Sequence, residues 1–296
     1  MRKPKIAVIG SSSMDLVVTS KRRPGAGETV LGESFKTVSG GKGANQAVAA
    51  ARLGAEVYMI GCVGEDAYGT EILNNFASNG VHTDYVEPVT QEKSGTAHII
   101  LAEGDNSIVV VKGANDHVTP EYVKEKRDFI ATCDLVMIQQ EVPEETVIEA
   151  AQLCHALGVP LLLNPAPARE IPDVVVEQVS YLTPNEHEAA LLFKKEELAS
   201  ALRKHPNKLF ITEGAAGVRY FDGEEEMLVP SFPVKPIDTT GAGDTFNAAF
   251  GTAIAEGMDV KESLRFANRA ASLSVTGFGA QGGMPSREEV ERGLGE

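Results

Sequence analysis

The sequence predicts an α/β protein with a doubly wound, mostly parallel central sheet flanked by helices. Three observations support this class. Short runs rich in β-branched residues alternate with helical patterns along most of the chain, several of these runs are apolar throughout, and the helical patterns end at glycines. Parallel strands covered on both faces have continuous apolar runs, and alternating strands and helices generate a parallel sheet.

Six apolar runs are expected to form the buried strands of this sheet. They lie at residues 5–10, 55–61, 134–139, 159–164, 180–185 and 208–212. Helices are expected at residues 43–54, 67–80 and 143–158. The last of these begins at Pro143, and proline suits the first turn of a helix because the N–H that it lacks has no partner there.

Two segments interrupt this alternation. Residues 15–39 and 95–112 each contain two strand-like runs around a glycine-containing turn, and neither contains a helical pattern. Two such hairpins would most easily assemble into a small sheet that stands off the main body as a lid, although they could instead extend the main sheet. We therefore expect a single domain over residues 1–296 with a discontinuous β lid. Because an exposed edge strand invites pairing, we also expect a homodimer joined through the lid strands.

The composition excludes some classes of partner. Lys and Arg number 27 against 42 Asp and Glu, for a net charge of −15. Nucleic acids and anionic membranes require a basic surface, so we expect neither as a partner. No run approaches the roughly 18 apolar residues of a membrane span, and the N-terminus lacks a signal-peptide pattern. Cys62, Cys133 and Cys154 show no CxxC spacing, which predicts reduced thiols in a cytoplasmic protein.

The stretch DTTGAGDTFN, residues 238–247, places Gly241, Ala242 and Gly243 directly before Asp244 at the start of a predicted helix. Asp244 could be an ordinary first-turn acid, which the helix dipole favours. Alternatively, the N–H groups of the three small residues could bind an anion while Asp244 acts as a general base beside a bound phosphate. This stretch alone does not separate the two interpretations.

A second glycine-rich stretch, SGGKGANQAVAAARLG at residues 39–54, also leads into a predicted helix. It could be a tight structural turn or a turn that approaches a ligand, and it matches neither a P-loop nor GxGxxG. Polar residues also follow the predicted strands, where open α/β sheets bind ligands. Each could be a turn residue or a helix cap, but together they indicate a polar cleft; they are Asp15, Glu141, Asn164, Asn185 and Thr212.

Four motifs together resemble the ribokinase family of carbohydrate kinases. They are GGKGANQAVAA, NPAPARE, TPNEHEA and DTTGAGDTFN, in this order and at these separations, and the similarity covers nearly the full chain. The NPAPAR and GANQAVAA segments are typical of the branch that phosphorylates ribose. The resemblance implies transfer of a phosphoryl group from ATP to the 5-hydroxyl of D-ribose, giving D-ribose 5-phosphate and ADP.

The resemblance also implies roles for individual residues. Asp244 would be the general base, and the N–H groups of Gly241, Ala242 and Gly243 would form the anion hole. The sugar would be bound by Ser13, Asp15, Gly40, Gly41, Lys42, Asn45 and Glu141, together with Asp244. Ser13 departs from the family's pattern, because many members have an asparagine there.

The cofactors implied by the resemblance are ATP, Mg²⁺ and K⁺. ATP and its magnesium would be bound by Asn185, Glu188, Thr212, Gly214, Gly217, Gly243 and Asn268. Potassium would be held by the Asp238 carboxylate and by backbone carbonyls at Thr240 and around Ser274, Gly277, Gly279 and Gly283. Rings of carbonyl oxygens suit a large, weakly hydrated cation.

Several alternatives within and outside this family stay open. Kinases that act on deoxyribose, fructose or nucleosides would keep Asp244 and the anion hole and differ in the lid and the sugar pocket. A non-catalytic sugar or nucleotide sensor would be expected to have lost the base or the anion hole, and this sequence retains both.

Overall fold

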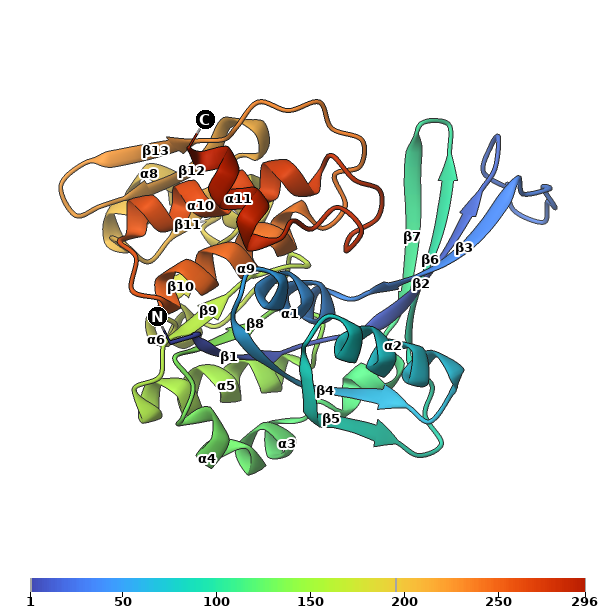
Figure 1. Ribbon diagram of the computed structural model, residues 1–296, viewed down its shortest axis with the longest axis horizontal. Helices are drawn as coiled ribbons and strands as arrows, with labels where there is room; N and C mark the ends of the chain where they lie inside the picture. The colour runs from blue at the N-terminus through green and yellow to red at the C-terminus, as the bar shows by residue number, and fades with distance from the viewer. Residues whose placement is uncertain (1, 195, 296) are drawn as a thin grey trace.

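A computed structural model describes residues 2–194 and 196–295, and its centre is a six-stranded sheet in the order β10-β9-β8-β1-β4-β5 (Figure 1). All neighbouring strands are parallel, which confirms the predicted sheet. The strands are β1 (Lys5–Ile9), β4 (Glu56–Gly64), β5 (His82–Val89), β8 (Leu135–Ile138), β9 (Leu161–Leu163) and β10 (Tyr181–Leu182).

Helices cover both faces of this sheet, and alternate residues of β1 point to the two faces. Ile6 and Val8 belong to one core cluster, while Ala7 and Ile9 belong to the other. The first face packs against α1 (Lys42–Arg52), α2 (Ala67–Ser78), α9 (Ala242–Ala255), α10 (Val260–Ser274) and α11 (Arg287–Leu294). The second packs against α3 (Pro120–Glu125), α4 (Arg127–Ile130), α5 (Glu144–Leu157), α6 (Asp173–Gln178), α7 (Glu186–Leu192) and α8 (Leu198–Lys204).

The predicted strand at residues 208–212 lies outside the central sheet. Its residues 210–212 form β11 (Phe210–Thr212), which pairs in a three-stranded antiparallel sheet with β12 (Gly217–Phe221) and β13 (Glu226–Pro230). Only two isolated parallel bridges join this region to β10 and the residues after it. We attribute the break to Pro184, which follows β10 closely and has no N–H to donate to a ladder.

The sequence pattern missed the edge strand β5. This strand is only partly buried and contains Pro88, so it lacks the continuous apolar run of the inner strands. Prolines are tolerated in edge strands because one side of the ladder is open there. The helix after DTTGAGD begins at Ala242, with Gly241 as its N-cap. Asp244 is therefore the third residue of α9 and does not open it.

The two predicted hairpins form a separate four-stranded sheet, in the order β3-β2-β6-β7, and do not extend the main sheet. In Figure 1 this sheet projects from the main body at the right. Its strands are β2 (Ser13–Thr19), β3 (Ser34–Gly40), β6 (Gly95–Ala102) and β7 (Asp105–Val111). The single domain over residues 1–296 stays a prediction, and its two terminal residues lie outside the described part. No helix in the described residues combines the length and apolar character that a bilayer span requires.

Candidate active site

The two glycine-rich stretches meet where α1 packs against α9, and Asn45 and Asp244 are 199 residues apart in sequence. Asn45 Nδ2 donates a hydrogen bond to Asp244 Oδ2 over 2.9 Å, and Gln46 Nε2 donates to Asp244 Oδ1 over 3.1 Å. Asp244 is 6% exposed. The carboxylate predicted to be the base therefore lies directly against the helix that follows the GGKG turn.

The surroundings of Asp244 make it more basic than an ordinary aspartate. Burial raises its pKa, and the Lys42 ammonium together with the Asn45 and Gln46 amides offsets part of this increase. Burial disfavours the charged form of a carboxyl group, while positive charge and N–H donors favour it. The net rise in pKa suits a group that has to accept a proton from a hydroxyl.

The start of α9 exposes backbone N–H groups beside Asp244. Ala242 N–H makes a long hydrogen bond of 3.3 Å to the Thr239 carbonyl. The N–H groups of Gly241 and Gly243 have no acceptor among residues 2–194 and 196–295. Two of the three predicted anion-hole donors are thus available, and the third is held only weakly.

Asp15 and Glu141 are two of the side chains predicted to bind the sugar. Ser13 Oγ donates to Asp15 Oδ1 over 3.2 Å. A Cβ at Gly40 would collide with the Asp15 carboxylate, so the GGKG turn packs directly on this group. Burial raises the pKa of Asp15 to about 6, and the negative charges of Glu141 and Asp244 add to the rise. The negative charge of Glu141 is therefore close enough to affect the ionisation of Asp15.

Lys42 and Glu141 complete this cluster. Glu141 Oε2 accepts from the backbone N–H of Lys42 over 2.9 Å and from the Ser11 hydroxyl. The negative charge of Asp244 raises the pKa of the Lys42 side chain, against the effect of burial, and Glu141 adds to it. The ammonium group stays charged among several carboxylates, and it can donate up to three hydrogen bonds.

Asn185, which is predicted to bind the nucleotide, is a helix cap. Its Oδ1 accepts from the N–H of Glu188 over 2.8 Å, and Glu188 Oε2 accepts from the N–H of Asn185 over 2.9 Å, which is a capping box at the start of α7. Burial raises the pKa of Glu188. A β-bridge sets Thr212 beside Asn185, Gly214 begins the 3-10 turn that follows, and Gly217 begins β12.

The NH₂ group of Asn268 on α10 is hydrogen-bonded within the protein. Its Nδ2 donates to the carbonyls of Val229 and Pro230, over 2.8 and 3.1 Å. The side chain thereby anchors the end of β13. Its predicted role in binding ATP stays a prediction.

The residues predicted to hold potassium converge in two loops. Asp238 Oδ1 accepts from Thr240 N–H and Oδ2 accepts from Gly279 N–H, each over 2.9 Å. Gly283 packs directly on the Ser274 carbonyl, and a Cβ at Gly277 would lie 2.5 Å from the Gly283 Cα. The described residues contain no group of three or more His, Cys, Asp or Glu that could hold a metal. A carbonyl-based cation site fits this donor set.

This arrangement can be compared with known proteins. The chain matches the pfkB family of carbohydrate kinases over residues 3–287. The chain belongs to this family. The pfkB-family relatives include the ribokinase of Bacillus subtilis (strain 168), which is 66% identical over 286 residues, covering 97% of this chain and 98% of the relative. The ribokinase of Lactococcus lactis subsp. lactis (strain IL1403) is 47% identical over 293 residues, 99% of this chain and 97% of the relative.

A solved pfkB-family structure has the same fold. The ribokinase of Arabidopsis thaliana complexed with ribose and ATP superposes with a TM-score of 0.90 at 35% identity, covering 98% of each chain. The superposition confirms the predicted α/β fold, and the family match confirms the resemblance to the ribokinase family that the sequence motifs indicated.

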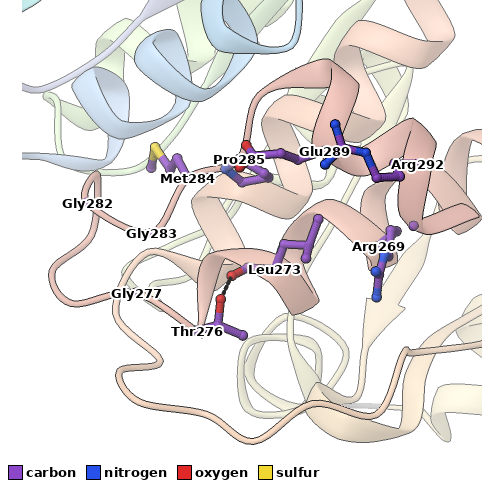
Figure 2. A pocket seen from close by; sticks show the side chains of 11 residues that line it. Arg269, Leu273, Thr276, Gly277, Gly282, Gly283, Met284, Pro285, Glu289 and Arg292 are labelled. Atoms are coloured by element: carbon purple, nitrogen blue, oxygen red, sulfur yellow. Dashed lines mark hydrogen bonds between the residues drawn. The ribbon is translucent and has the colours of Figure 1, made fainter.

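A pocket of about 390 Å³ is lined in part by the loop of residues 277–283, which we call the glycine loop (Figure 2). Arg269 from α10 and Glu289 and Arg292 from α11 line it. From the predicted site only Gly277 and Gly283 reach this pocket. The clustered carboxylates around Asp244 are therefore a separate feature of the molecule.

Sequence reasoning missed three residues that touch the site, namely Ser11, Gln46 and Gln281. Ser11 donates to Glu141, Gln46 donates to Asp244, and Gln281 Nε2 donates to Asn45 Oδ1 over 3.0 Å. Gln46 directly follows Asn45 within the GGKGANQ motif, so its position in the motif could have identified it as a site residue. No local signal marks Gln281, because its partner is 236 residues away.

Proposed function

We propose that this chain phosphorylates D-ribose at the 5-hydroxyl with ATP, giving D-ribose 5-phosphate and ADP. The observation that carries the proposal is the buried Asp244, held by Asn45 and Gln46 at the N-terminus of α9. Similarity over nearly the full chain to ribokinases, one of which is complexed with ribose and ATP, supports the choice of substrates.

In this proposal Asp244 accepts the proton of the 5-hydroxyl as its oxygen attacks the γ-phosphorus. The bond between that phosphorus and the bridging oxygen of ATP breaks, and ADP leaves. The N–H groups of Gly241 and Gly243, aided by the positive end of α9, hold the charge on the transferring group. Positioning and charge stabilisation supply most of the acceleration in phosphoryl transfer.

The sugar is recognised by groups of opposite hydrogen-bonding character. The carboxylates of Asp15 and Glu141 accept from sugar hydroxyls, while Lys42 and the amide of Asn45 donate to them. Asp15 lies on β2 at the base of the four-stranded sheet. We propose that this sheet is the lid of the site, which covers the sugar and excludes water during transfer.

Two cations complete the proposed chemistry. Asn185 and Glu188 would help to hold magnesium, mostly through water and phosphate oxygens, because Mg²⁺ keeps much of its hydration shell. When bound, Mg²⁺ neutralises phosphate charge. Asp238 and the carbonyls of the two loops would hold potassium, and Gly241 links these loops to the anion hole because it packs on Ala280.

A panel of sugars in a coupled ADP-release assay tests the substrate. We expect D-ribose to give the highest kcat/KM among ribose, 2-deoxyribose, fructose and a nucleoside. A higher value for another sugar would assign the chain to a different kinase activity of the same family. No ADP release with any of them would favour the sensor interpretation.

Replacing Na⁺ by K⁺ at constant ionic strength is expected to raise turnover severalfold. Carbonyl oxygens replace the hydration shell of K⁺ well, and the ion would order the loop that packs on Gly241. Asp238→Asn, which retains a single acceptor oxygen for the two N–H groups of Thr240 and Gly279, should remove most of the K⁺ effect. Equal rates in the two salts would eliminate the potassium site.

We also propose that the protein is a cytoplasmic homodimer. Its three cysteines are buried and unpaired, as expected in a reducing compartment. Ile108, Val109, Val110 and Val111 on the edge strand β7 are all at least half exposed. An exposed apolar edge strand favours pairing with a second copy of the chain.

Val109→Lys is therefore expected to convert a dimer into a monomer in multi-angle light scattering at micromolar concentration. The charge would lie in an interface that has no partner for it. Leu228→Lys, at an exposed apolar position on β13, is the matched control and should leave the mass unchanged. A wild-type protein of monomer mass would refute the dimer.

A further inference from the structure

Asp244 is the end point of two chains of hydrogen-bonded carboxamides. In the first, Gln139 Nε2 donates to Gln46 Oε1 over 2.6 Å, and Gln46 Nε2 donates to Asp244 Oδ1 over 3.1 Å. The second N–H of Gln46 reaches Asn164 Oδ1 over 3.1 Å. Gln46 is fully buried and Gln139 is 1% exposed, so water does not substitute for these contacts.

The second chain begins on α2 and passes through the glycine loop. Asn75 Nδ2 donates to Gln281 Oε1 over 2.9 Å, Gln281 Nε2 donates to Asn45 Oδ1 over 3.0 Å, and Asn45 Nδ2 donates to Asp244 Oδ2 over 2.9 Å. Asn45 and Gln281 are each 6% exposed. Each oxygen of the carboxylate is therefore the terminus of one chain.

Both chains have the same direction. An ionised carboxylate can only accept hydrogen bonds, so Gln46 and Asn45 have to present their NH₂ groups to Asp244. Their oxygens then have to meet the NH₂ groups of Gln139 and Gln281. Aligned hydrogen bonds polarise one another, which strengthens donation at the end of each chain. Reversing either chain would require every amide in it to flip.

We propose that Gln46 and Gln281 are positioning residues of the general base, and that the two amide chains keep Asp244 ionised and fix the orientation of both its oxygens. The proposal deepens the proposed function, on which it rests for the role of Asp244. It also connects the glycine loop to the base, because Gln281 lies between Gly277 and Gly283 and its carbonyl is held by Arg52 Nη1 over 2.6 Å.

The amides counteract groups around Asp244 that raise its pKa. Burial raises the pKa of Asp244, Glu141 raises it further, and Lys42 from α1 lowers it. The negative charge of Asp244 in turn helps to raise the pKa of Asp15 on β2 and of Glu188 on α7, in both cases after burial. If one amide donor to Asp244 is lost, burial and Glu141 still raise the pKa of Asp244. Only Lys42 and the remaining amide then lower it.

Gln46→Met and Gln281→Met test the proposal, because methionine preserves length and removes the amide. A hydrogen bond to a charged group is worth enough to shift a pKa by roughly one unit. For Gln46→Met, which removes a donor to Asp244, we expect the acidic limb of the kcat–pH profile to move up by about one pH unit, so that kcat on that limb falls roughly tenfold, with KM for ATP nearly unchanged. Gln281→Met removes a donor to Asn45 and should move the limb in the same direction by a smaller amount. Gln281→Glu replaces the donor by an acceptor and should be more damaging than Gln281→Met.

Gln178→Met on α6 is the matched control, since its amide belongs to neither chain. A purely structural role for Gln46 and Gln281 would lower the melting temperature and leave the pH limb in place, and that result would overturn the proposal. The two glutamines lie in different elements, so either variant can carry the test if the other unfolds.

A second readout does not require turnover. Carboxyl ¹³C NMR of aspartate-labelled protein, assigned with Asp244→Asn, should show the Asp244 titration moving to higher pH in both methionine variants. If wild-type protein phosphorylates no sugar but this titration moves, the proposed function fails and the positioning role stands. If wild-type protein phosphorylates ribose and neither the titration nor the kcat limb moves, the positioning role fails alone.

Discussion

Asp244→Asn is expected to lower kcat by roughly 10²–10⁴-fold, the range typical for loss of a general base, while ribose and ATP still bind. Asparagine has nearly the same shape but cannot accept the hydroxyl proton. It keeps an acceptor oxygen for only one of Asn45 and Gln46, and its NH₂ group faces the other, so the amide chain on that side has to reverse. Steady-state kinetics give kcat, and calorimetric titration with ribose and a non-hydrolysable ATP analogue gives the affinities.

Asp259→Asn is the control for this substitution. Asp259 is the N-cap of α10, where its Oδ1 accepts from the N–H of Glu262 over 3.0 Å. Asparagine caps helices about as well as aspartate, so this variant should retain wild-type kinetics and stability. Near-normal turnover by Asp244→Asn would contradict the assignment of the base and, with it, the proposed mechanism.

Gly243→Ala is expected to reduce kcat/KM for ATP by about 10²-fold without destabilising the fold. Alanine keeps the backbone N–H, but its methyl group would hold the phosphate away from that donor, and losing one donor contact in an anion hole typically has an effect of this size. A Cβ at Gly243 would meet no protein atom within 4 Å, so the new methyl group would occupy the space where the proposal sets the transferring phosphate. The position lies inside α9, where alanine is favoured over glycine by roughly 0.5–1 kcal/mol.

For Gly243→Ala, urea unfolding measures the stability and steady-state kinetics on the same samples measure kcat/KM, which separates a loss of activity from a loss of folding. Gly295→Ala, at the end of α11, adds a methyl group in ordinary contact 3.7 Å from the Arg292 carbonyl and should change neither quantity. Gly241→Ala is a contrasting case, because Gly241 has a φ of 78° and a Cβ there would lie 2.8 Å from the Ala280 carbonyl oxygen. That variant should lose stability as well. Full activity in Gly243→Ala would mean that no phosphate approaches α9 there.

The sequence predicted the parts of the fold whose patterns are local. The inner strands are continuous apolar runs and the helices end at glycines, so five of the six predicted strands join the central sheet. The edge strand β5 has no such run, and the pairing of β11 depends on which backbone lies beside it. Local propensity does not determine either outcome, because strand pairing is a contact between distant segments.

The sequence also predicted the chemistry-bearing residues, which lie in short motifs. Asp244, the Gly241–Gly243 backbone and the GGKG turn belong to short motifs in which backbone conformation and function are set by adjacent residues. Asn185 shows the limit of this reasoning, because the same side chain is an N-cap in the structure and a nucleotide contact in the prediction. The free N–H groups at a helix start can be bound either by a capping side chain or by a phosphate group.

The sequence by itself determined which residues could carry the reaction, since glycine-rich helix starts with an adjacent acid are encoded within a few consecutive positions. Only the tertiary structure decided what surrounds the base. The chain from Asn75 through Gln281 and Asn45 to Asp244 joins α2, the glycine loop, α1 and α9. Such a network forms only when packing buries these amides together, because buried polar groups have to satisfy one another in the absence of water.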